Sequence, residues 1–469
     1  MLKPDKDLIT KFTAIVGEKY AITDPDVQAA YLHEQRERWP GNSPLILRPD
    51  STAQVSAILK LASETRTAIV PQGGNTGLVG AQMPLDGEIV LSLNRMTRIR
   101  EVDPVTNTLT AEAGVTLQQA REAAAQADRL YPQLLPSEGT CTIGGNLSTN
   151  AGGTAAIAHG VARSHALGLE VVLADGRVLN NLNKLKKDNT GYDLKNLFIG
   201  AEGTLGIITA AVLRLVPRPR SVELAVFGLP SVQAAVDLLG IAYERAGSQV
   251  TSFELMTRMN VDLALRFIPG TREPLQQPHP WYVLMELSSQ AESGLRDIVE
   301  TIFEAGVERG LIVDGMIAET LEQAKGIWRI REEAGDVQKR EGGSIKHDVS
   351  VPIAAIPAFI EEANAAAVAI VPGARPMPFG HVGDGNIHYN ITQPIGMDKD
   401  AFMAREEDVQ RAVFAVVAKY GGSISAEHGI GIAKRDWLPR VKDPVALAVM
   451  RQLKATLDPN GILNPGKVL

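Results

Sequence analysis

The sequence predicts an α+β fold with two domains of different pattern, and three observations lead to this prediction. The chain has 469 residues, enough for two or three domains at roughly 150 residues each. Strand-like and helix-like segments alternate from Pro44 and stop near Pro217. Pro217-Arg218-Pro219 then interrupts regular pairing, because two prolines in three residues remove backbone donors. We therefore expect one domain before this linker and another after it.

The elements of the first domain follow from short apolar patterns. Asp50-Ser51-Thr52 offers a helix N-cap, and residues 53–63 and 117–127 carry apolar side chains at helical spacing. Strands are expected at residues 45–47, 68–70, 88–93, 108–112, 170–174 and 207–216. The second of these strands runs directly into a glycine-rich turn.

The second domain has a different order of elements. Strand, helix, strand, strand, helix and helix are expected at residues 222–227, 231–246, 251–255, 281–287, 295–308 and 319–333. An antiparallel sheet with helices on one face fits this order. A further helix at residues 402–420 ends at Gly421-Gly422. The tail is expected to pack back on the first domain, which gives domain bounds of 1–217, 218–420 and 421–469.

Composition excludes several classes of protein. Lys plus Arg number 47 and Asp plus Glu 54, for a net charge of -7 without long runs of one sign, so nucleic acid is not an expected partner. The most apolar stretches, residues 365–371 and 412–418, are far shorter than the roughly 20 residues of a membrane helix. The single cysteine, Cys141, excludes an intrachain disulfide. The first residues lack the apolar stretch of a signal peptide, so we expect a cytoplasmic location.

Three glycine-rich segments in the first domain suggest a site for one long anionic ligand. They are residues 71–80, 136–153 and 200–206. Glycines let backbone N–H groups converge on an anion without obstruction by Cβ atoms, and pyrophosphate is the expected guest of the first segment. That segment lacks the Gly-Lys-Ser/Thr of a P-loop, and it does not run into a helix as a Rossmann turn does. A single glycine loop usually marks only a turn, but three in one domain favour a shared ligand.

In their order and spacing, these segments resemble the FAD-binding domain of the vanillyl-alcohol-oxidase and p-cresol-methylhydroxylase superfamily. The first, Pro71-Gln-Gly-Gly-Asn-Thr-Gly-Leu-Val-Gly80, is similar to the form found in D-2-hydroxyglutarate dehydrogenases. Glycolate and D-lactate members usually have a loop closer to Gly-Ala-Gly-Thr-Gly. The resemblance runs from about Leu45 to Pro465 and implies a flavin domain split between the two ends of the chain, with a cap domain between.

The resemblance also implies which residues hold FAD, and it implies non-covalent binding because no anchoring histidine or cysteine matches. The first segment would hold the pyrophosphate through Pro71, Gln72, Gly73, Gly74, Asn75, Thr76, Gly77 and Gly80. The remaining predicted contacts are Ser137, Gly139, Thr140, Gly144, Gly145, Ser148 and Asn150 along the cofactor, Glu202, Gly203 and Ile208 along its adenosine half, and Asn464 in the tail.

Histidines near the end of the chain suggest a metal site. In Gly380-His-Val-Gly-Asp-Gly-Asn-Ile-His-Tyr-Asn390 a turn dipeptide lies between His381 and His388, so a hairpin would bring the two imidazoles together. Glu427 is a candidate third ligand, and a His, His, Glu set leaves coordination positions open for catalysis. A single histidine is more often an ordinary hydrogen-bonded one. The resemblance supports the full set, since metal-dependent D-2-hydroxyacid dehydrogenases have His-x6-His followed by Glu-His. Zinc is the expected metal.

The chemistry of a 2-hydroxy acid gives this set a purpose. The acid chelates a metal through its hydroxyl and one carboxylate oxygen, which makes the hydroxyl proton easier to remove. His428 would accept that proton while the Cα hydrogen passes as hydride to flavin N5. The resemblance assigns Arg331 and Lys346 to the substrate carboxylates and Asn390 to a place beside the metal. Gly335 stands where relatives often present a threonine.

The sequence therefore predicts an FAD- and metal-dependent D-2-hydroxyacid dehydrogenase, with D-2-hydroxyglutarate ahead of D-malate as substrate. The alternatives are a D-lactate or glycolate dehydrogenase, a metal hydrolase in which the glycine loops are only structural, and a non-enzymatic nucleotide-binding protein. The electron acceptor stays open, with an electron-transfer flavoprotein as one option. The oligomeric state is also open, with a homodimer as one option.

Overall fold

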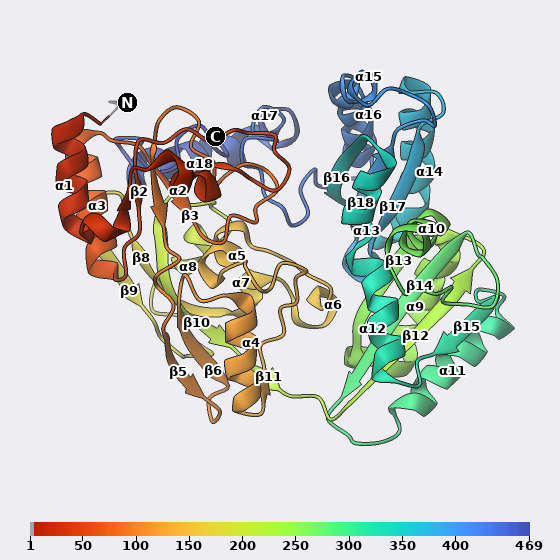
Figure 1. Ribbon diagram of the computed structural model, residues 1–469. Coiled ribbons are helices and arrows are strands. Elements are labelled where there is room, and N and C mark those ends of the chain that lie inside the picture. Colours follow the sequence, from red (N-terminus) through yellow and green to blue (C-terminus); the bar gives the residue numbers. More distant parts are fainter. Residues whose placement is uncertain (1–3) are drawn as a thin grey trace. The chain divides into compact units, whose positions relative to one another are not determined.

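The structure is a computed structural model that describes residues 4–469, and it divides into two compact units (Figure 1). Unit 1 comprises the chain up to Gly153, residues Gly160–Arg218 and residues Glu427–Leu469. Unit 2 comprises Thr154–His159 and Pro219–Ala426. The sequence placed the first boundary at residues 217/218 and the second at 420/421. Residues 421–426 belong with unit 2 because Ser350 and Ser423 exchange two backbone hydrogen bonds.

Unit 1 contains a small mostly parallel sheet with the order β1-β2-β4-β3. Its strands are β1 (Ala21–Ile22), β2 (Ile46–Leu47), β3 (Ile69–Gln72) and β4 (Ile89–Ser92). The helices beside it are α1 (Lys6–Val16), α2 (Pro25–Leu32) and α3 (Thr52–Thr65), with the 3-10 turn η1 (Glu18–Tyr20). Ser51 caps α3 by accepting from the backbone N–H of Gln54, as the sequence predicted. Ile69 of β3 packs in one buried core with Val55 and Ile58 of α3, so the strand that leads into the first glycine segment is held in the interior of unit 1.

The second sheet of unit 1 is antiparallel, with the order β5-β6-β10-β8-β9. Its strands are β5 (Ile99–Asp103), β6 (Thr108–Glu112), β8 (Ala166–Val172), β9 (Val178–Asn181) and β10 (Ile207–Arg214), and β7 (Arg129–Leu130) pairs separately with β11 (Val216–Pro217). The accompanying helices are α4 (Leu117–Gln126), α5 (Ile143–Thr149), α7 (Ala162–His165) and α8 (Lys195–Phe198). Strand β8 begins four residues before the predicted start, because Ala166 already pairs with Leu213 of β10.

The C-terminal segment completes unit 1. It contains α17 (Leu438–Val441) and α18 (Pro444–Leu457), drawn in blue in Figure 1. Leu463 then pairs in parallel with Ile69 of β3. Lys454 ties the segment down further by donating to the carbonyls of Thr204 and Leu463 and to the Asp458 carboxylate. The end of the chain thus lies against the strand that precedes the first glycine segment.

Unit 2 is built on a seven-stranded sheet, antiparallel throughout, with the order β15-β12-β14-β13-β17-β18-β16. The strands are β12 (Ser221–Leu229), β13 (Val250–Thr257), β14 (Trp281–Ser289), β15 (Asp314–Ile317), β16 (Ser344–Ser350), β17 (Arg375–His381) and β18 (Asn386–Thr392). The helices are α6 (Ala156–His159), α9 (Val232–Ala246), α10 (Arg258–Phe267), α11 (Leu295–Glu308), α12 (Leu321–Glu332), α13 (Ala334–Val337), α14 (Ile356–Ile370), α15 (Lys399–Met403) and α16 (Glu406–Lys419). Short 3-10 turns lie at η2 (Gly247–Gln249), η3 (Gln338–Glu341), η4 (Ile353–Ala355) and η5 (Val382–Asp384).

Helices cover both faces of this sheet, whereas the sequence predicted helices on one face. Leu224 and Val226 of β12 pack in one core with residues of α10, α12 and α13. Phe227, which points to the opposite face of the same strand, stacks on Phe303 of α11 at 5.8 Å between ring centroids. The central strand β13 is buried at every position, as a strand covered on both sides must be. The predicted helix over residues 402–420 is also divided, into α15 and α16.

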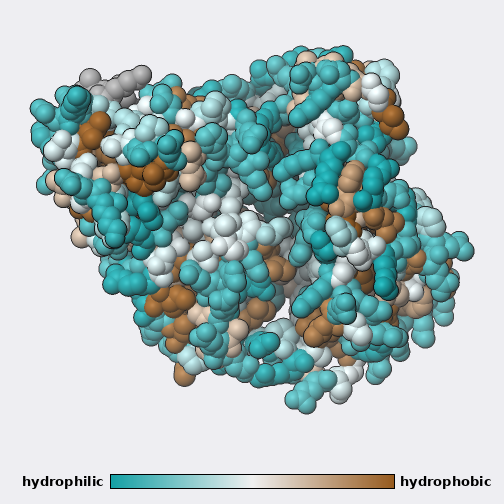
Figure 2. Space-filling model, in the orientation of Figure 1, coloured by the Kyte–Doolittle hydropathy of each residue, from teal (hydrophilic) through white to brown (hydrophobic). Residues whose placement is uncertain are grey.

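One stretch of unit 2, Ile353–Ile370, is long and apolar enough to cross a membrane on length and composition alone, with a mean hydropathy of 1.5. In α14 the buried residues Ile356, Phe359, Ile360, Ala363 and Ala367 lie along one face. This spacing is typical of a helix that packs one side on a domain core. On the face shown in Figure 2, hydrophilic residues predominate and hydrophobic residues form small separate groups.

Candidate cofactor and substrate sites

The three glycine segments of unit 1 are in direct contact with one another. A Cβ atom on Gly74 would overlap the Thr140 carbonyl oxygen, and one on Gly73 would overlap the Thr142 hydroxyl. A Cβ on Gly203 would overlap the ring of Pro71. The first segment therefore packs on the second and third so closely that only glycine fits at these three positions.

The first segment offers a row of backbone donors. Within the part of the chain that the structure describes, the N–H groups of residues 73–78 make no hydrogen bond. Asn75 adopts a left-handed conformation (φ 56°), fixed by hydrogen bonds from its Nδ2 to the carbonyls of Ala30 and His33. The Oδ1 atoms of Asn75 and Asn464 are buried and have no hydrogen-bond partner among the described residues. Backbone N–H groups without partners in a glycine-rich loop suit a pyrophosphate, and two buried amide oxygens without partners suit polar groups of the same dinucleotide, so these residues fit FAD.

Several other predicted cofactor residues use their side chains within the protein. Ser148 donates to the Gly144 carbonyl (2.7 Å), and Asn150 accepts from the Arg163 N–H (2.9 Å). Ile208 lies in the core of the antiparallel sheet. Contacts from Gly139, Thr140, Gly144 and Gly145 to FAD would come from the backbone. The roles assigned to this group stay predictions.

Glu202 of the third segment connects the glycine segments to the C-terminal segment. Its carboxylate accepts from the backbone N–H groups of Ile430 (2.7 Å) and Gly431 (2.9 Å). Its carbonyl accepts from Asn464 Nδ2 (2.7 Å), and its own backbone is left-handed (φ 51°). Burial raises the pKa of Glu202 to about 7, although the two N–H donors and Lys434 favour the charged form. The expected contact of this side chain with the adenosine half stays a prediction, since its oxygens face the loop after His428.

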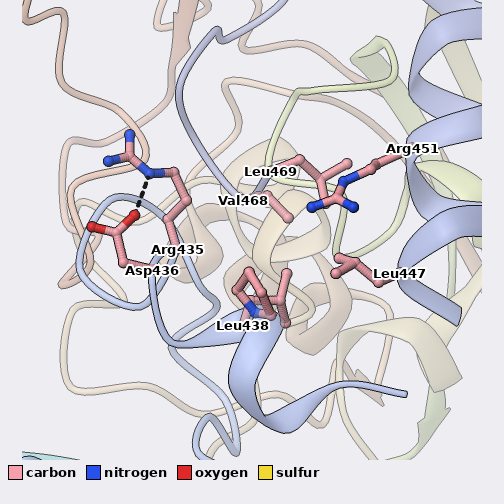
Figure 3. Close-up of a pocket in the computed structure, with 8 residues that line it drawn as sticks. Arg435, Asp436, Leu438, Leu447, Arg451, Val468 and Leu469 are labelled. Carbon is pink, nitrogen blue, oxygen red and sulfur yellow. Dashed lines mark hydrogen bonds and ion pairs between the residues drawn. The ribbon is translucent and has the colours of Figure 1, made fainter. Parts of the chain in front are cut away.

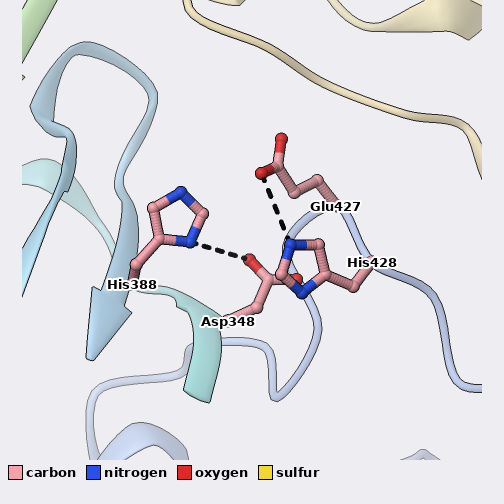
Figure 4. A group of neighbouring side chains, drawn as sticks. All are labelled: Asp348, His388, Glu427 and His428. Carbon is pink, nitrogen blue, oxygen red and sulfur yellow. Dashed lines mark ion pairs between the residues drawn. The ribbon is translucent and has the colours of Figure 1, made fainter. Parts of the chain in front are cut away.

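Glu427 and His428 are the first two residues of the C-terminal part of unit 1, just before the loop whose backbone donates to Glu202. His428 Nε2 and Glu427 Oε1 are 3.8 Å apart, as Figure 4 shows. A Cβ on Gly152 would come within 2.5 Å of Glu427 Oε2, so this carboxylate lies directly against the second glycine segment. The pair is therefore placed in the cofactor unit, beside one of the three segments that fit FAD.

In unit 2 the hairpin of β17 and β18 brings His381 and His388 together as the sequence predicted. Phe379 is the cross-strand partner of His388, and Gly385 makes the turn with φ 84°. The two imidazole ring centroids are 5.4 Å apart. His388 Nδ1 also lies 3.9 Å from Asp348 Oδ1, a pair drawn in Figure 4. Imidazole and carboxylate are donor types that zinc prefers, and His388 and Asp348 lie close enough together to serve as ligands of one divalent metal ion.

Glu254 of β13 joins two of the predicted site residues. One carboxylate oxygen is 2.6 Å from His381 Nδ1, and the other accepts from Arg331 Nε at 2.7 Å. Although burial disfavours the charged form, Arg331 and His381 hold the pKa of Glu254 below its usual value. The Arg331 guanidinium lies 4.9 Å from the Phe379 ring, and its Nη2 is buried with no hydrogen-bond partner among the described residues. An unpaired nitrogen on a buried cation is costly, so Arg331 is well placed to bind an anion.

Lys346 and Asn390 are cross-strand partners on β16 and β18. Lys346 Nζ donates to the Gly335 carbonyl (2.6 Å), and a Cβ on Gly335 would meet only this Nζ, at 3.9 Å. Asn390 Nδ2 donates to Gln338. Helix α12, which carries Arg331, ends at Glu332, and Gly335 belongs to the separate helix α13.

Two residues at the site, Glu254 and Asp348, were missed by the sequence analysis. Asp348 lies two positions after Lys346 on one strand, so period-two spacing could have placed both on one face. Glu254 is the one charged residue of the central strand β13, which is buried at every position. A buried acid in such a strand needs a charged partner, and that was the available signal.

A cavity of about 490 Å³ lies in unit 1 near the C-terminus (Figure 3). It is lined by Arg435, Asp436, Leu438, Pro439, Leu447, Arg451, Val468 and Leu469. None of the residues predicted to bind FAD, metal or substrate lines it. We therefore assign it no role in the reaction.

Comparison with solved structures identifies the fold. The structure of p-cresol methylhydroxylase with substrate bound superposes with a TM-score of 0.78 at 18% identity, covering 98% of this chain and 96% of that one. The sequence resemblance to the vanillyl-alcohol-oxidase and p-cresol-methylhydroxylase superfamily is thus confirmed at the level of the fold. The chain therefore has the fold of that class, with a cofactor-binding unit and a second unit built on an antiparallel sheet.

Sequence comparison then gives the family. The pattern of the FAD binding domain matches residues 43–181, and that of the FAD linked oxidases, C-terminal domain, matches residues 218–468. A D-2-hydroxyglutarate dehydrogenase of Stutzerimonas stutzeri (strain A1501) is 36% identical over 99% of both chains. A probable mitochondrial D-2-hydroxyglutarate dehydrogenase of Oryza sativa subsp. indica is 38% identical over 99% of this chain and 82% of the relative. The chain belongs to the FAD-linked oxidase family.

Proposed function

We propose that the protein is an FAD-dependent dehydrogenase that oxidises D-2-hydroxyglutarate to the corresponding 2-oxo acid. The relatives named above carry this activity in their names and match the chain over nearly its whole length. The observation that supports the substrate class most directly is the buried Arg331, whose Nη2 has no partner among the described residues. Together with Lys346 it offers two cations, which suit the two carboxylates of a dicarboxylic substrate.

Each residue of the site then has a defined task. When bound, FAD supplies a two-electron acceptor and a divalent metal supplies a Lewis acid. Arg331 and Lys346 bind and orient the carboxylates, and Asn390 positions the reacting end. His428 would accept the hydroxyl proton, while bound FAD would take up the Cα hydrogen as hydride, so that the substrate leaves as the 2-oxo acid. D-malate is the second dicarboxylate expected to react.

We propose that His381, His388 and Glu427 bind the metal and that the metal is zinc. The support is the pair of imidazoles on β17 and β18, with His381 held through Nδ1 by a carboxylate. Histidines that ligate metals commonly donate their second nitrogen in this way. Elemental analysis of the purified protein should find about one zinc per chain, and loss of that zinc on changing His388 to Ala would support the assignment.

We further propose that FAD binds without a covalent bond and is reoxidised by a separate carrier, with an electron-transfer flavoprotein as the first candidate. Acid precipitation should leave the flavin in the supernatant, since Cys141 is buried in the core of unit 1. A homodimer and a cytoplasmic location stay predictions.

The substrate proposal is tested by comparing kcat/KM for D-2-hydroxyglutarate, D-malate and D-lactate with an artificial electron acceptor. A site with a buried cation discriminates against a substrate that leaves the cation unpaired. We expect D-2-hydroxyglutarate or D-malate to exceed D-lactate, and Arg331→Ala to narrow that gap. Arg329→Ala is the matched control, because Arg329 lies on the same helix but is exposed and paired with Glu333. Equal or better turnover of D-lactate by the unmodified protein would favour the D-lactate dehydrogenase alternative.

A further inference from the structure

We propose that Glu254 is a positioning residue that orients Arg331 and His381 together, so that carboxylate recognition and metal ligation depend on one buried side chain. The inference deepens the proposed function and rests on it for the roles of the two partners.

The geometry of β13 places Glu254 between its two partners. Glu254 is fully buried and is the cross-strand neighbour of His381, the last residue of β17. Arg331 reaches the same carboxylate from α12, 77 positions along the chain. Each carboxylate oxygen serves one partner, at 2.6 Å and 2.7 Å. The two predicted site residues are therefore connected through a single group.

The contact with His381 decides which ring nitrogen can bind a metal. A carboxylate is only an acceptor, so Nδ1 of the neutral imidazole must carry the proton. The lone pair is then on Nε2, which is the nitrogen that can ligate. Carboxylate partners of this kind orient the ring and make the histidine a better ligand.

The contact with Arg331 decides which guanidinium nitrogens can meet a substrate. Glu254 takes Nε, and the Phe379 ring lies against the guanidinium at 4.9 Å. These two contacts hold the plane of the group, while Nη2 is buried without a partner among the described residues. The guanidinium is thus held in one orientation, in which Nε is bound to Glu254 and Nη2 can donate to an anion.

Glutamine cannot replace Glu254, because an amide has one acceptor oxygen and the site needs two acceptors. The amide oxygen should turn to Arg331, since a hydrogen bond to a buried cation is the stronger of the two. The amide NH₂ then faces His381 and forces the proton onto Nε2. Glu254→Gln is therefore expected to impair metal binding first.

The test is an isothermal calorimetric titration in which Zn²⁺ is added to the metal-free, flavin-loaded protein and the Zn²⁺ affinity is measured. Glu254→Gln is expected to weaken Zn²⁺ binding by roughly 10- to 100-fold, as other changes to partners of metal ligands do. The flavin absorption spectrum should be unchanged. Glu286→Gln is the matched control: Glu286 is a partly buried carboxylate on the adjacent strand β14, paired with Trp328 and Thr251, and its change should leave Zn²⁺ affinity unaltered.

A second variant and readout keep the test decisive if Glu254→Gln does not fold. Glu254→Asp keeps the charge but is one methylene shorter, so it can reach only one partner. It should weaken Zn²⁺ binding, or raise KM for D-2-hydroxyglutarate at saturating Zn²⁺ with little change in kcat. Normal values for both in a folded variant would overturn the proposal. Zn²⁺ affinity is measured without substrate. If the protein does not oxidise D-2-hydroxyglutarate, the Zn²⁺ measurement therefore still tests the role of Glu254.

Discussion

Raising the pH through neutrality is expected to destabilise unit 1 through Glu202. This carboxylate lies between the third glycine segment and the loop after His428, where it accepts from two backbone N–H groups. Burial raises its pKa from 4.5 to about 7. In the unfolded chain the same group is fully hydrated and ionises near its ordinary value.

The sign and size follow from this difference. The folded state holds the proton more tightly than the unfolded state, so the favourable contribution is complete below about pH 4.5 and is lost as the pH rises through 7. At about 1.4 kcal/mol per pKa unit, the difference between 4.5 and about 7 amounts to about 3 kcal/mol. Most of this loss should fall between pH 5 and pH 8.

The assay compares the unmodified protein with Glu202→Gln, which cannot ionise but keeps the shape of the side chain. Urea unfolding is measured at pH 5, 6, 7 and 8 through the fluorescence of released flavin. This signal reports on unit 1, because the glycine segments that fit FAD belong to that unit. FAD and protein concentrations are kept fixed, because ligand binding shifts apparent stability. The free energy of unfolding of the unmodified protein should fall by about 2.5 kcal/mol relative to the variant over this range, because part of the total loss occurs below pH 5.

A constant difference between the two proteins from pH 5 to pH 8 would show that Glu202 does not titrate there. A loss of stability relative to the variant that appears only as the pH falls below 4.5 would show that the N–H donors outweigh burial and keep the carboxylate charged. Either result would refute the reasoning from burial.

Four further outcomes test other parts of the structure. Gly74→Ala should weaken FAD binding by about 1–3 kcal/mol, because its Cβ would overlap the Thr140 carbonyl oxygen; unchanged affinity by equilibrium dialysis would contradict the close packing of the segments. Gly240→Ala should stabilise unit 2 by up to about 1 kcal/mol in thermal unfolding, since Gly240 lies within α9 and has no heavy atom within 4 Å of an added Cβ. His428→Asn should lower the rate of flavin reduction by roughly 10²- to 10⁴-fold, and loss of metal instead would make His428 a ligand. A chelator should abolish turnover and leave the flavin spectrum intact, and full activity in protein shown to be metal-free would exclude the metal proposal.

The sequence determined the elements whose signals are local. The cap at Ser51 and the helical spacing of α11 follow from neighbouring residues, and the structure places α11 at the predicted bounds of residues 295–308. The three glycine segments were recognisable because glycine at fixed positions reflects a steric need of the backbone. The hairpin that joins His381 and His388 was predictable for the same reason, since a turn dipeptide separates two short strands.

Only the tertiary structure decided which groups, distant in the sequence, bind to the buried carboxylates of Glu254 and Glu202. Glu254 and Arg331 are 77 positions apart, and Glu202 and Ile430 are 228 apart. Such pairs depend on strand order and on the register between β13 and β17, and these are set by packing over the whole sheet rather than by local pattern. The same holds for the helices on both faces of the unit 2 sheet, because the pattern of a strand covered on both sides does not tell which helix covers which face. The sequence by itself determined the kind of cofactor domain and its glycine segments, while the fold determined the buried carboxylates that hold the site residues in place.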